Sequence, residues 1–174
     1  MGTYTANKGI IIIFNKDKIS IKNFEIIVEG QMVKFQSKHN SNLMNFVAIY
    51  APPECDDPNF LLTAKSALDS MPGDNGVIIG DFNSTKDPEK DRVGYQTDNH
   101  KKCRVILNSW EDTEELIDTF RHIHPESKSF TFRTKGLNKK SRLDYAFATP
   151  SLLLVSITSL IPSILSISLT MQLL

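Results

Sequence analysis

Val77-Ile78-Ile79-Gly80-Asp81-Phe82-Asn83 decides the fold: a short apolar strand ends at a glycine, and an acidic and an amide side chain follow it. Side chains two residues apart on an extended chain point the same way. We therefore expect Asp81 and Asn83 to face one cleft and Phe82 to turn into the core. A carboxylate beside an amide suits holding a water molecule against a phosphate. An ordinary strand-to-loop turn has the same composition, so this stretch alone leaves both interpretations open.

Further segments combine apolar strands with polar residues near their ends. Asn45–Pro53 is typical of a buried strand that delivers Tyr50 into a loop stiffened by prolines. Ser141–Phe147 predicts another strand, which carries Asp144. Between them, three short segments have the spacing of a loop that leads into a strand: Asp118–Arg121, His124-Pro125 and Ser129–Phe132.

Taken in order over roughly residues 9 to 150, these segments resemble the endonuclease/exonuclease/phosphatase superfamily, which has the DNase I-like fold. The residues from Asp81 to Arg92 and from Ser141 to Tyr145 are most similar to the endonuclease domain of LINE-type (non-LTR) retrotransposons. The resemblance implies an α/β fold, a four-layer α/β/β/α sandwich that is incomplete here. It also implies a partial domain over residues 1–150. Residues 151–174 form an uncharged tail, expected to be a degraded last part of the same domain.

The resemblance also implies a chemistry, the hydrolysis of phosphodiester or phosphomonoester bonds with Mg²⁺ or Mn²⁺ and no small-molecule cofactor. Asp81 would align or deprotonate the attacking water, and Asn83 would hold that water or a phosphate oxygen. Tyr50 would place its phenol near the scissile phosphate, and Asp144 would orient a catalytic histidine. The substrate implied is DNA, nicked by a retroelement endonuclease.

The chain departs from the family pattern in two places. We find no counterpart of the early strand with an asparagine or of the Gln-Glu strand whose glutamate binds the metal. The Ser-Asp-His motif expected near Ile164–Leu169 is also missing, and none of the four histidines matches its position. The metal ligands therefore stay unknown, and we expect a truncated copy with little or no nuclease activity. The alternatives are a non-catalytic DNA- or protein-binding remnant, a phosphatase of the same superfamily, and a fragment without a selected role.

The overall charge does not indicate nucleic-acid binding, because 20 basic and 20 acidic residues balance in a chain of 174 residues. Any affinity for DNA must come from a local patch. The candidate DNA contacts are Arg92, Arg133, Lys139, Lys140 and Arg142, of which four fall in a short basic segment. Such a segment is equally typical of a solvated face. We expect Asp91 and its neighbours Asp87, Glu89 and Arg92 to form a solvated loop, and Asp118 and Arg121 to be a structural pair that shapes another.

Residue composition predicts one soluble domain inside the cell, nuclear or cytoplasmic. Cys55 and Cys103 have neither disulfide-framework nor metal-ligand spacing, so both are expected to be reduced. Tyr145–Leu174 contains no charged residue, which would suit a membrane helix by length. However, residues 165–173 alternate apolar and polar side chains, which favours a strand over a membrane helix.

The remaining periodicity predicts the secondary structure. A turn cluster at Pro72–Gly76 ends a helix that begins at Asp57-Pro58 and continues to about Ser70. A second helix is expected over residues 99–110. Strands are expected over residues 9–14, 19–28, 31–36, 42–50, 77–79, 130–133 and 142–148.

Overall fold

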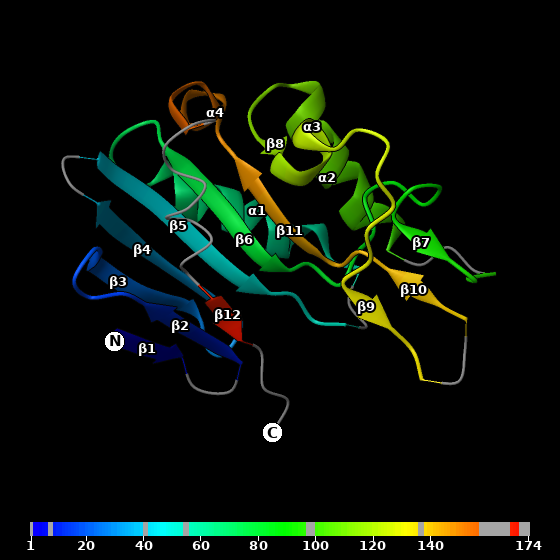
Figure 1. Cartoon of the computed structure of the whole chain (residues 1–174), viewed down its shortest axis with the longest axis horizontal. Helices are drawn as coiled ribbons and strands as arrows, with labels where there is room; N and C mark the ends of the chain where they lie inside the picture. Colours follow the sequence, from blue (N-terminus) through cyan, green and yellow to red (C-terminus); the bar gives the residue numbers. More distant parts are fainter. Residues whose placement is uncertain are drawn as a thin grey trace.

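A computed structural model of the chain shows a mixed α/β domain built on a six-stranded sheet (Figure 1). It describes residues 2–6, 9–39, 42–53, 56–96, 100–135, 138–156 and 168–170. The strand order of the large sheet is β3-β4-β5-β6-β11-β8. Only the β5–β6 pair is parallel; its neighbours in the sheet are antiparallel. The strands are β3 (Ser20–Val28), β4 (Met32–His39), β5 (Asn42–Tyr50), β6 (Gly76–Asp81), β8 (Ile117–Asp118) and β11 (Asp144–Ala148).

A three-stranded sheet covers one face of the large sheet. It has the order β1-β2-β12, from β1 (Gly2–Ala6), β2 (Ile10–Phe14) and β12 (Ser168–Thr170). Ile10, Ile12 and Phe14 alternate inward from β2 and join a core with every second residue of the central strands, such as Phe35 and Phe46. Period-two alternation therefore produces the layer between the two sheets.

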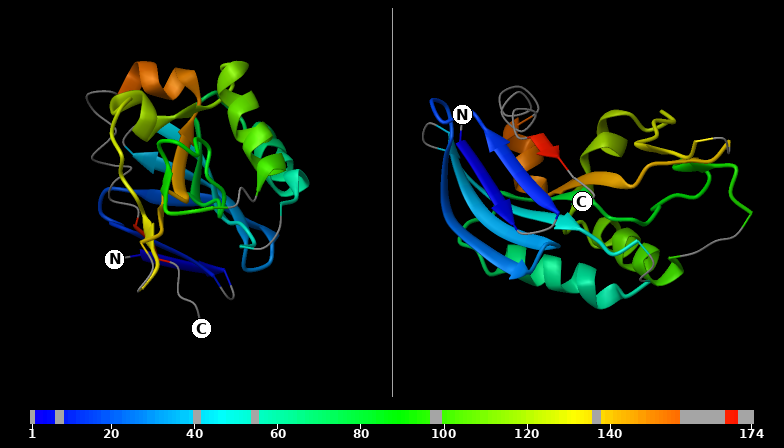
Figure 2. Two further views of the ribbon diagram at one scale, coloured as in Figure 1. Left: turned by 90° about the vertical axis from the view of Figure 1, so that its right-hand side faces the viewer. Right: turned by 90° about the horizontal axis from the view of Figure 1, so that it is seen from below.

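Two helices cover the opposite face of the large sheet (Figure 2, right). In α1 (Pro58–Asp69), the carboxylate of Asp57 caps the first turn by accepting from the N–H of Asn59, and proline occupies the first helical position. α2 (Lys101–Asp112) buries Leu107 and Trp110. These helices share a second core with the other side chains of the strands, in which Phe147 lies 5.4 Å from the rings of both Trp110 and Phe82.

Of the remaining elements, a third sheet lies beyond the carboxyl end of β6, whereas α4 (Pro150–Ser156) lies near its amino end, where Ala148 of β11 pairs with Val77 (Figure 1). The third sheet has the order β7-β10-β9 and projects from the body at the right of Figure 1, formed by β7 (Arg92–Val93), β10 (Lys140–Ser141) and β9 (Phe132–Arg133). The short helix α3 (Thr119–Ile123) follows β8 directly, and Asp118 caps it. α4 follows β11, and its Leu152 is buried in the core between the sheets.

Most of the predicted elements are confirmed with shifts of a few residues at their ends. β1 was missed, although Gly2–Ala6 pairs in full register with β2. The short strands β7, β8 and β10 and helices α3 and α4 were also missed, because elements of this length leave no periodic signal. The strand predicted in the tail is confirmed at Ser168–Thr170, and the rest of residues 165–173 lies outside the described residues. Among the described residues, no helix combines the length and apolarity required to span a bilayer.

Gly80 sits where β6 approaches β5 too closely for a side chain. Its φ is +142°, and a Cβ atom there would lie 1.9 Å from the carbonyl oxygen of Ile49. We expect Gly80→Ala to lower the free energy of unfolding by at least about 3 kcal/mol, because the backbone must move at the pair of strands that carries Asp81. Urea denaturation followed by circular dichroism measures this.

Gly73→Ala is the matched control, since Gly73 also has positive φ (+89°) but no atom within 4 Å of the added methyl. Its cost is expected to be about 1 kcal/mol. Equal losses for the two variants would show that close packing at Gly80 does not matter.

Candidate active site

Three polar side chains form a row across neighbouring strands of the large sheet. Tyr50 pairs with Asp81 in the β5–β6 register, and Asp81 pairs with Asp144 in the β6–β11 register. Directly paired residues point to the same face of a sheet. On each strand, every second residue faces the smaller sheet, and these three residues belong to that set. They lie where the apolar core between the two sheets ends. The fold therefore brings together three residues that lie far apart in the sequence.

Asn83 joins this row from the loop after β6. Its backbone is left-handed (φ +45°), and its N–H donates to Asp81 Oδ1 at 2.8 Å. The side-chain Nδ2 donates to the carbonyl oxygen of Ala51 at 2.6 Å, which turns Oδ1 away from that carbonyl group. Phe82 between them is 2% exposed. The prediction that Asp81 and Asn83 face one cleft while Phe82 enters the core is therefore confirmed.

These side chains line a cleft of about 680 Å³. Its floor holds Tyr50, Asp81, Asn83 and Asp144. The remaining lining side chains come from the loops around it and from the third sheet: Pro53, Thr85, Arg92, Tyr95, His100, Thr131, Phe132, Ser141 and Leu143. Two carboxylates on the floor require a cation or a proton beside them before a phosphate group can bind, whereas the partly aromatic and basic rim suits an organic phosphate ester.

The protonation of Asp81 is strongly perturbed. Burial of the carboxyl group is the main cause that raises its pKa to about 6; the N–H of Asn83 opposes this, and the negative charge of Asp144 adds to it. A carboxylate whose pKa lies near neutrality can accept a proton from water more readily than an ordinary one. The environment of Asp81 thus suits the role of general base.

A buried ionic network lies behind the cleft. The Arg142 guanidinium donates from Nε to Asp91 Oδ1 at 3.0 Å and from Nη1 to Asp118 Oδ1 at 3.0 Å. Arg121 Nη2 donates to the same Asp91 oxygen at 2.7 Å. The side chains of Asp91 and Asp118 are fully buried, and that of Arg142 is 3% exposed. Two arginines therefore neutralise two buried aspartates.

Tyr145 connects this network to the loop after β6. Burial, together with the Asp91 carboxylate, raises the pKa of the Tyr145 phenol well above its usual value, so the phenol stays protonated. It donates to the carbonyl oxygen of Arg142 at 3.0 Å and accepts from the N–H of Lys86 at 2.9 Å. The network thereby fixes the segments on both sides of Asp144.

The network corrects two predictions. Arg142 was a candidate DNA contact, but its guanidinium is buried and satisfied by two carboxylates, so it cannot reach a phosphate backbone. Asp91 was expected in a solvated loop, but it is fully buried. Asp118 and Arg121 do shape one loop, since Asp118 Oδ1 accepts from the Arg121 N–H at 3.1 Å, although the arginine side chain pairs with Asp91.

The other four basic candidates lie on the third sheet or beside it. Arg92 begins β7 and lines the cleft, Arg133 is exposed at the end of β9, and Lys140 pairs opposite both Val93 and Arg133. The ammonium of Lys139 lies 5.5 Å from the centre of the Tyr95 ring. These residues stay candidates for a DNA contact.

The sequence interpretation missed two features of the cleft. Thr131 Oγ1 accepts from the N–H groups of Leu143 and Asp144, at 3.0 and 3.2 Å, and so holds the start of β11. His100 lines the cleft from the residue before α2, in a left-handed conformation (φ +62°). No periodic pattern in the sequence predicts either feature, because both depend on the conformation of loops.

The oxygen ligands of the cleft suit a divalent metal ion only in part. Among the described residues, no group of three or more histidine, cysteine, aspartate or glutamate side chains could hold one. Mg²⁺ is commonly bound by one or two carboxylates together with substrate phosphate oxygens. Asp144, which pairs with Asp81 on the floor of the cleft, fits that kind of site.

The sequence profile of the Endonuclease/Exonuclease/phosphatase family matches residues 5–166. The chain belongs to this family. Members hydrolyse phosphate esters and generally use divalent metal ions, so the predicted family and class of chemistry are confirmed at this level.

Comparison with solved structures confirms the α/β class with a central sheet. The endonuclease domain of TRAS1, a telomere-specific non-LTR retrotransposon, superposes with a TM-score of 0.61 at 19% identity, over 82% of this chain and 61% of that one. The 3' phosphatase NExo from Neisseria, bound to a product DNA hairpin, matches with a TM-score of 0.48 at 19% identity, over 76% and 58%. This chain therefore spans less than two thirds of the length of either protein.

Replacing Arg142 by methionine should strongly destabilise the protein. Methionine keeps similar bulk but leaves Asp91 and Asp118 buried with too few cationic partners, which costs about 3–5 kcal/mol. Arg133→Met, at an exposed side chain of β9, should change the free energy of unfolding by less than about 0.5 kcal/mol. Urea denaturation compares the two, and a loss below about 1 kcal/mol for Arg142→Met would contradict the structural role assigned to the network.

The raised pKa of Asp81 makes stability depend on pH. In the unfolded chain this carboxyl loses its proton near its ordinary pKa of 3.8, and in the folded protein at about 6. Between these values the folded state binds more protons, so the free energy of unfolding falls as pH rises through the window. We expect Asp81→Asn to be more stable than wild type at pH 7 without divalent ions, with the difference vanishing near pH 4.

Urea denaturation at pH 4, 5, 6 and 7 tests this dependence. Asp74→Asn, which changes an exposed carboxylate far from the cleft, should track wild type at every pH. A gain for Asp81→Asn that is constant from pH 4 to 7 would show that its cause is not the titration of the carboxyl group.

Proposed function

We propose that this chain is a metal-dependent phosphodiesterase that nicks DNA. The observation that carries the proposal is the row of Tyr50, Asp81 and Asp144 on the floor of one cleft, with Asn83 hydrogen-bonded to Asp81. A general base, an amide that positions water and a second carboxylate then converge on the space where a phosphate can lie.

Each residue has a role that its contacts support. Asp81 uses one oxygen to hold the Asn83 N–H, so its other oxygen is available to take the proton of the attacking water. The Asn83 amide is anchored to Ala51 through Nδ2, which leaves Oδ1 for that water. The Tyr50 phenol at the end of β5 donates a hydrogen bond to a non-bridging phosphate oxygen.

A divalent ion would neutralise the phosphate and stabilise the leaving oxygen. Asp144 would hold it, and the substrate phosphate would complete its coordination. Among the described residues, no third acidic or histidine side chain is placed so that it could bind one ion together with Asp81 and Asp144. We therefore expect slow turnover from this set of side chains.

DNA is the substrate that the surroundings of the cleft favour. Arg92, Arg133, Lys139 and Lys140 lie on or beside the third sheet at its rim and can follow a phosphate backbone. The similarity in fold to the endonuclease domain of a non-LTR retrotransposon agrees with this choice. The small number of metal ligands favours a second candidate, a DNA-binding domain without catalysis, which salt-dependent binding without cleavage would indicate.

Nicking of supercoiled plasmid by the purified chain tests the proposal. We expect slow cleavage that requires Mg²⁺ and falls by about 10²–10⁴-fold in Asp81→Asn, because the general base is lost. Asp74→Asn is the matched control, since it removes an exposed carboxylate outside the cleft. Cleavage that survives in Asp81→Asn or without metal would contradict the proposal, as would no cleavage by the folded wild-type protein.

A further inference from the structure

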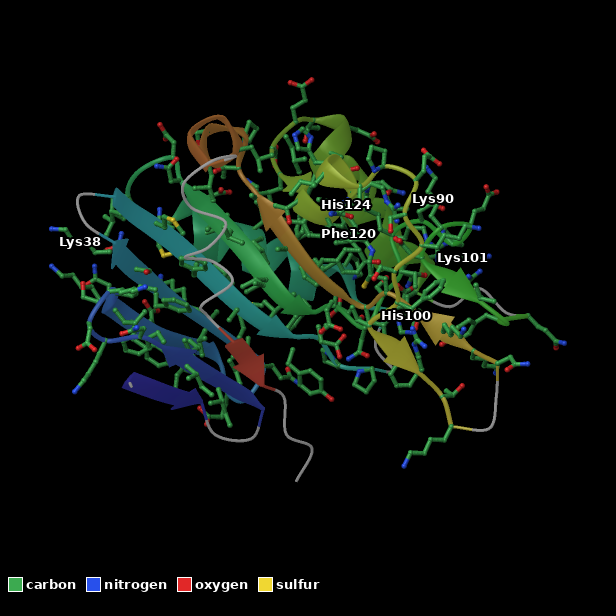
Figure 3. All side chains as sticks on the ribbon, viewed as in Figure 1. Lys38, Lys90, His100, Lys101, Phe120 and His124 are labelled. Carbon is green, nitrogen blue, oxygen red and sulfur yellow. The ribbon has the colours of Figure 1, made fainter. Side chains whose placement is uncertain are left out.

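His100 is a side chain of the cleft that the proposed reaction does not use. Of the described histidine side chains, His100 lines the cleft, whereas His122 and His124 are exposed on or just after α3. In Figure 3, His100 lies where the body of the protein meets the third sheet, and His124 lies beside α3. The imidazole therefore shares its space with Asp81 and Asp144.

The backbone at His100 is left-handed. A φ of +62° is uncommon for residues other than glycine, although histidine is among the types that adopt it more often. His100 is the residue directly before α2, but its side chain makes no capping hydrogen bond to the helix. The imidazole is therefore not used to cap α2.

Asp56 instead holds the start of α2. Its two carboxylate oxygens accept from the N–H groups of Lys102 and Cys103, at 3.0 and 2.9 Å. These two donors are therefore used within the protein and are not available to an anion in the cleft. Asp56 also ties α2 to the loop that follows Tyr50, which keeps His100 and Tyr50 on fixed walls of the same cleft.

We propose that His100 binds a non-bridging oxygen of the substrate phosphate, from the wall that faces the carboxylates Asp81 and Asp144. An imidazole can donate a hydrogen bond whether neutral or charged, so the contact does not require a particular protonation state. Lys101 and Lys102, both exposed in the first turn of α2, follow His100 directly in the sequence and add positive charge to this end of the helix. The assignment rests on the proposed phosphodiesterase function and adds a phosphate ligand to it.

Nuclear magnetic resonance of the histidine ring protons tests the contact directly. The wild-type chain would be titrated in Mg²⁺ with a DNA dinucleotide that carries one phosphodiester. The control ligand is its uncharged methylphosphonate analogue. We expect the His100 signals to shift with the phosphodiester and much less with the analogue, while the His122 and His124 signals stay in place. Unchanged His100 signals at saturation would overturn the assignment.

Substitution gives an independent measure. His100→Asn keeps a residue type that tolerates the left-handed conformation, and we expect it to weaken dinucleotide binding about tenfold. His122→Asn, the matched control on an exposed histidine, should bind within twofold of wild type, as expected for a surface site without substrate contact.

The two proposals can fail separately. If wild type binds the dinucleotide and nicks plasmid, and His100→Asn binds equally well, the contact with His100 is refuted and the hydrolytic function stands. If wild type neither binds nor nicks, both proposals fail.

Discussion

The cleft depends on Arg142 being held between two fully buried aspartates. Asp91 comes from the loop before β7, Asp118 from β8 and Arg142 from the segment between β10 and β11, so one guanidinium joins three segments of the chain. A buried carboxylate without a partner is very unfavourable, whereas the planar fork of arginine can satisfy two. The segments that form the rim of the cleft therefore favour the one arrangement in which both buried aspartates are paired with arginine.

The floor of the cleft is fixed differently. Tyr50, Asp81 and Asp144 stand in one row because the registers of β5, β6 and β11 place them there. Strand register cannot slip by one residue without turning the whole apolar face outward. The carboxylates thus lie on a rigid surface, while much of the rim of the cleft lies on loops held by the ionic network.

The sequence predicted the floor better than the rim. Period-two alternation is enough to put Asp81 and Asn83 on one side, but Tyr50 and Asp144 required the resemblance to a family. Arg142 was misread because a cluster of cations in sequence does not show which of them meet distant carboxylates; its partner Asp91 is 51 residues away. His100 could not be found, since its position depends on one left-handed residue before a helix.

The buried aspartates behind the cleft and those in the cleft differ in whether they are paired with cations, and this difference bears on function. Behind the cleft, Asp91 and Asp118 are each paired with arginine, which makes that region electrically neutral. In the cleft, Asp81 and Asp144 are directly paired on neighbouring strands, and neither forms an ion pair with an arginine or lysine of the described part of the chain. The pKa of Asp81 rises to about 6, mainly because of its burial and also because of the charge of Asp144. Burying like charges together lowers stability unless a proton or a cation joins them. The same arrangement that weakens the fold therefore raises the affinity of Asp81 for a proton, which is the property that a general base at this position requires.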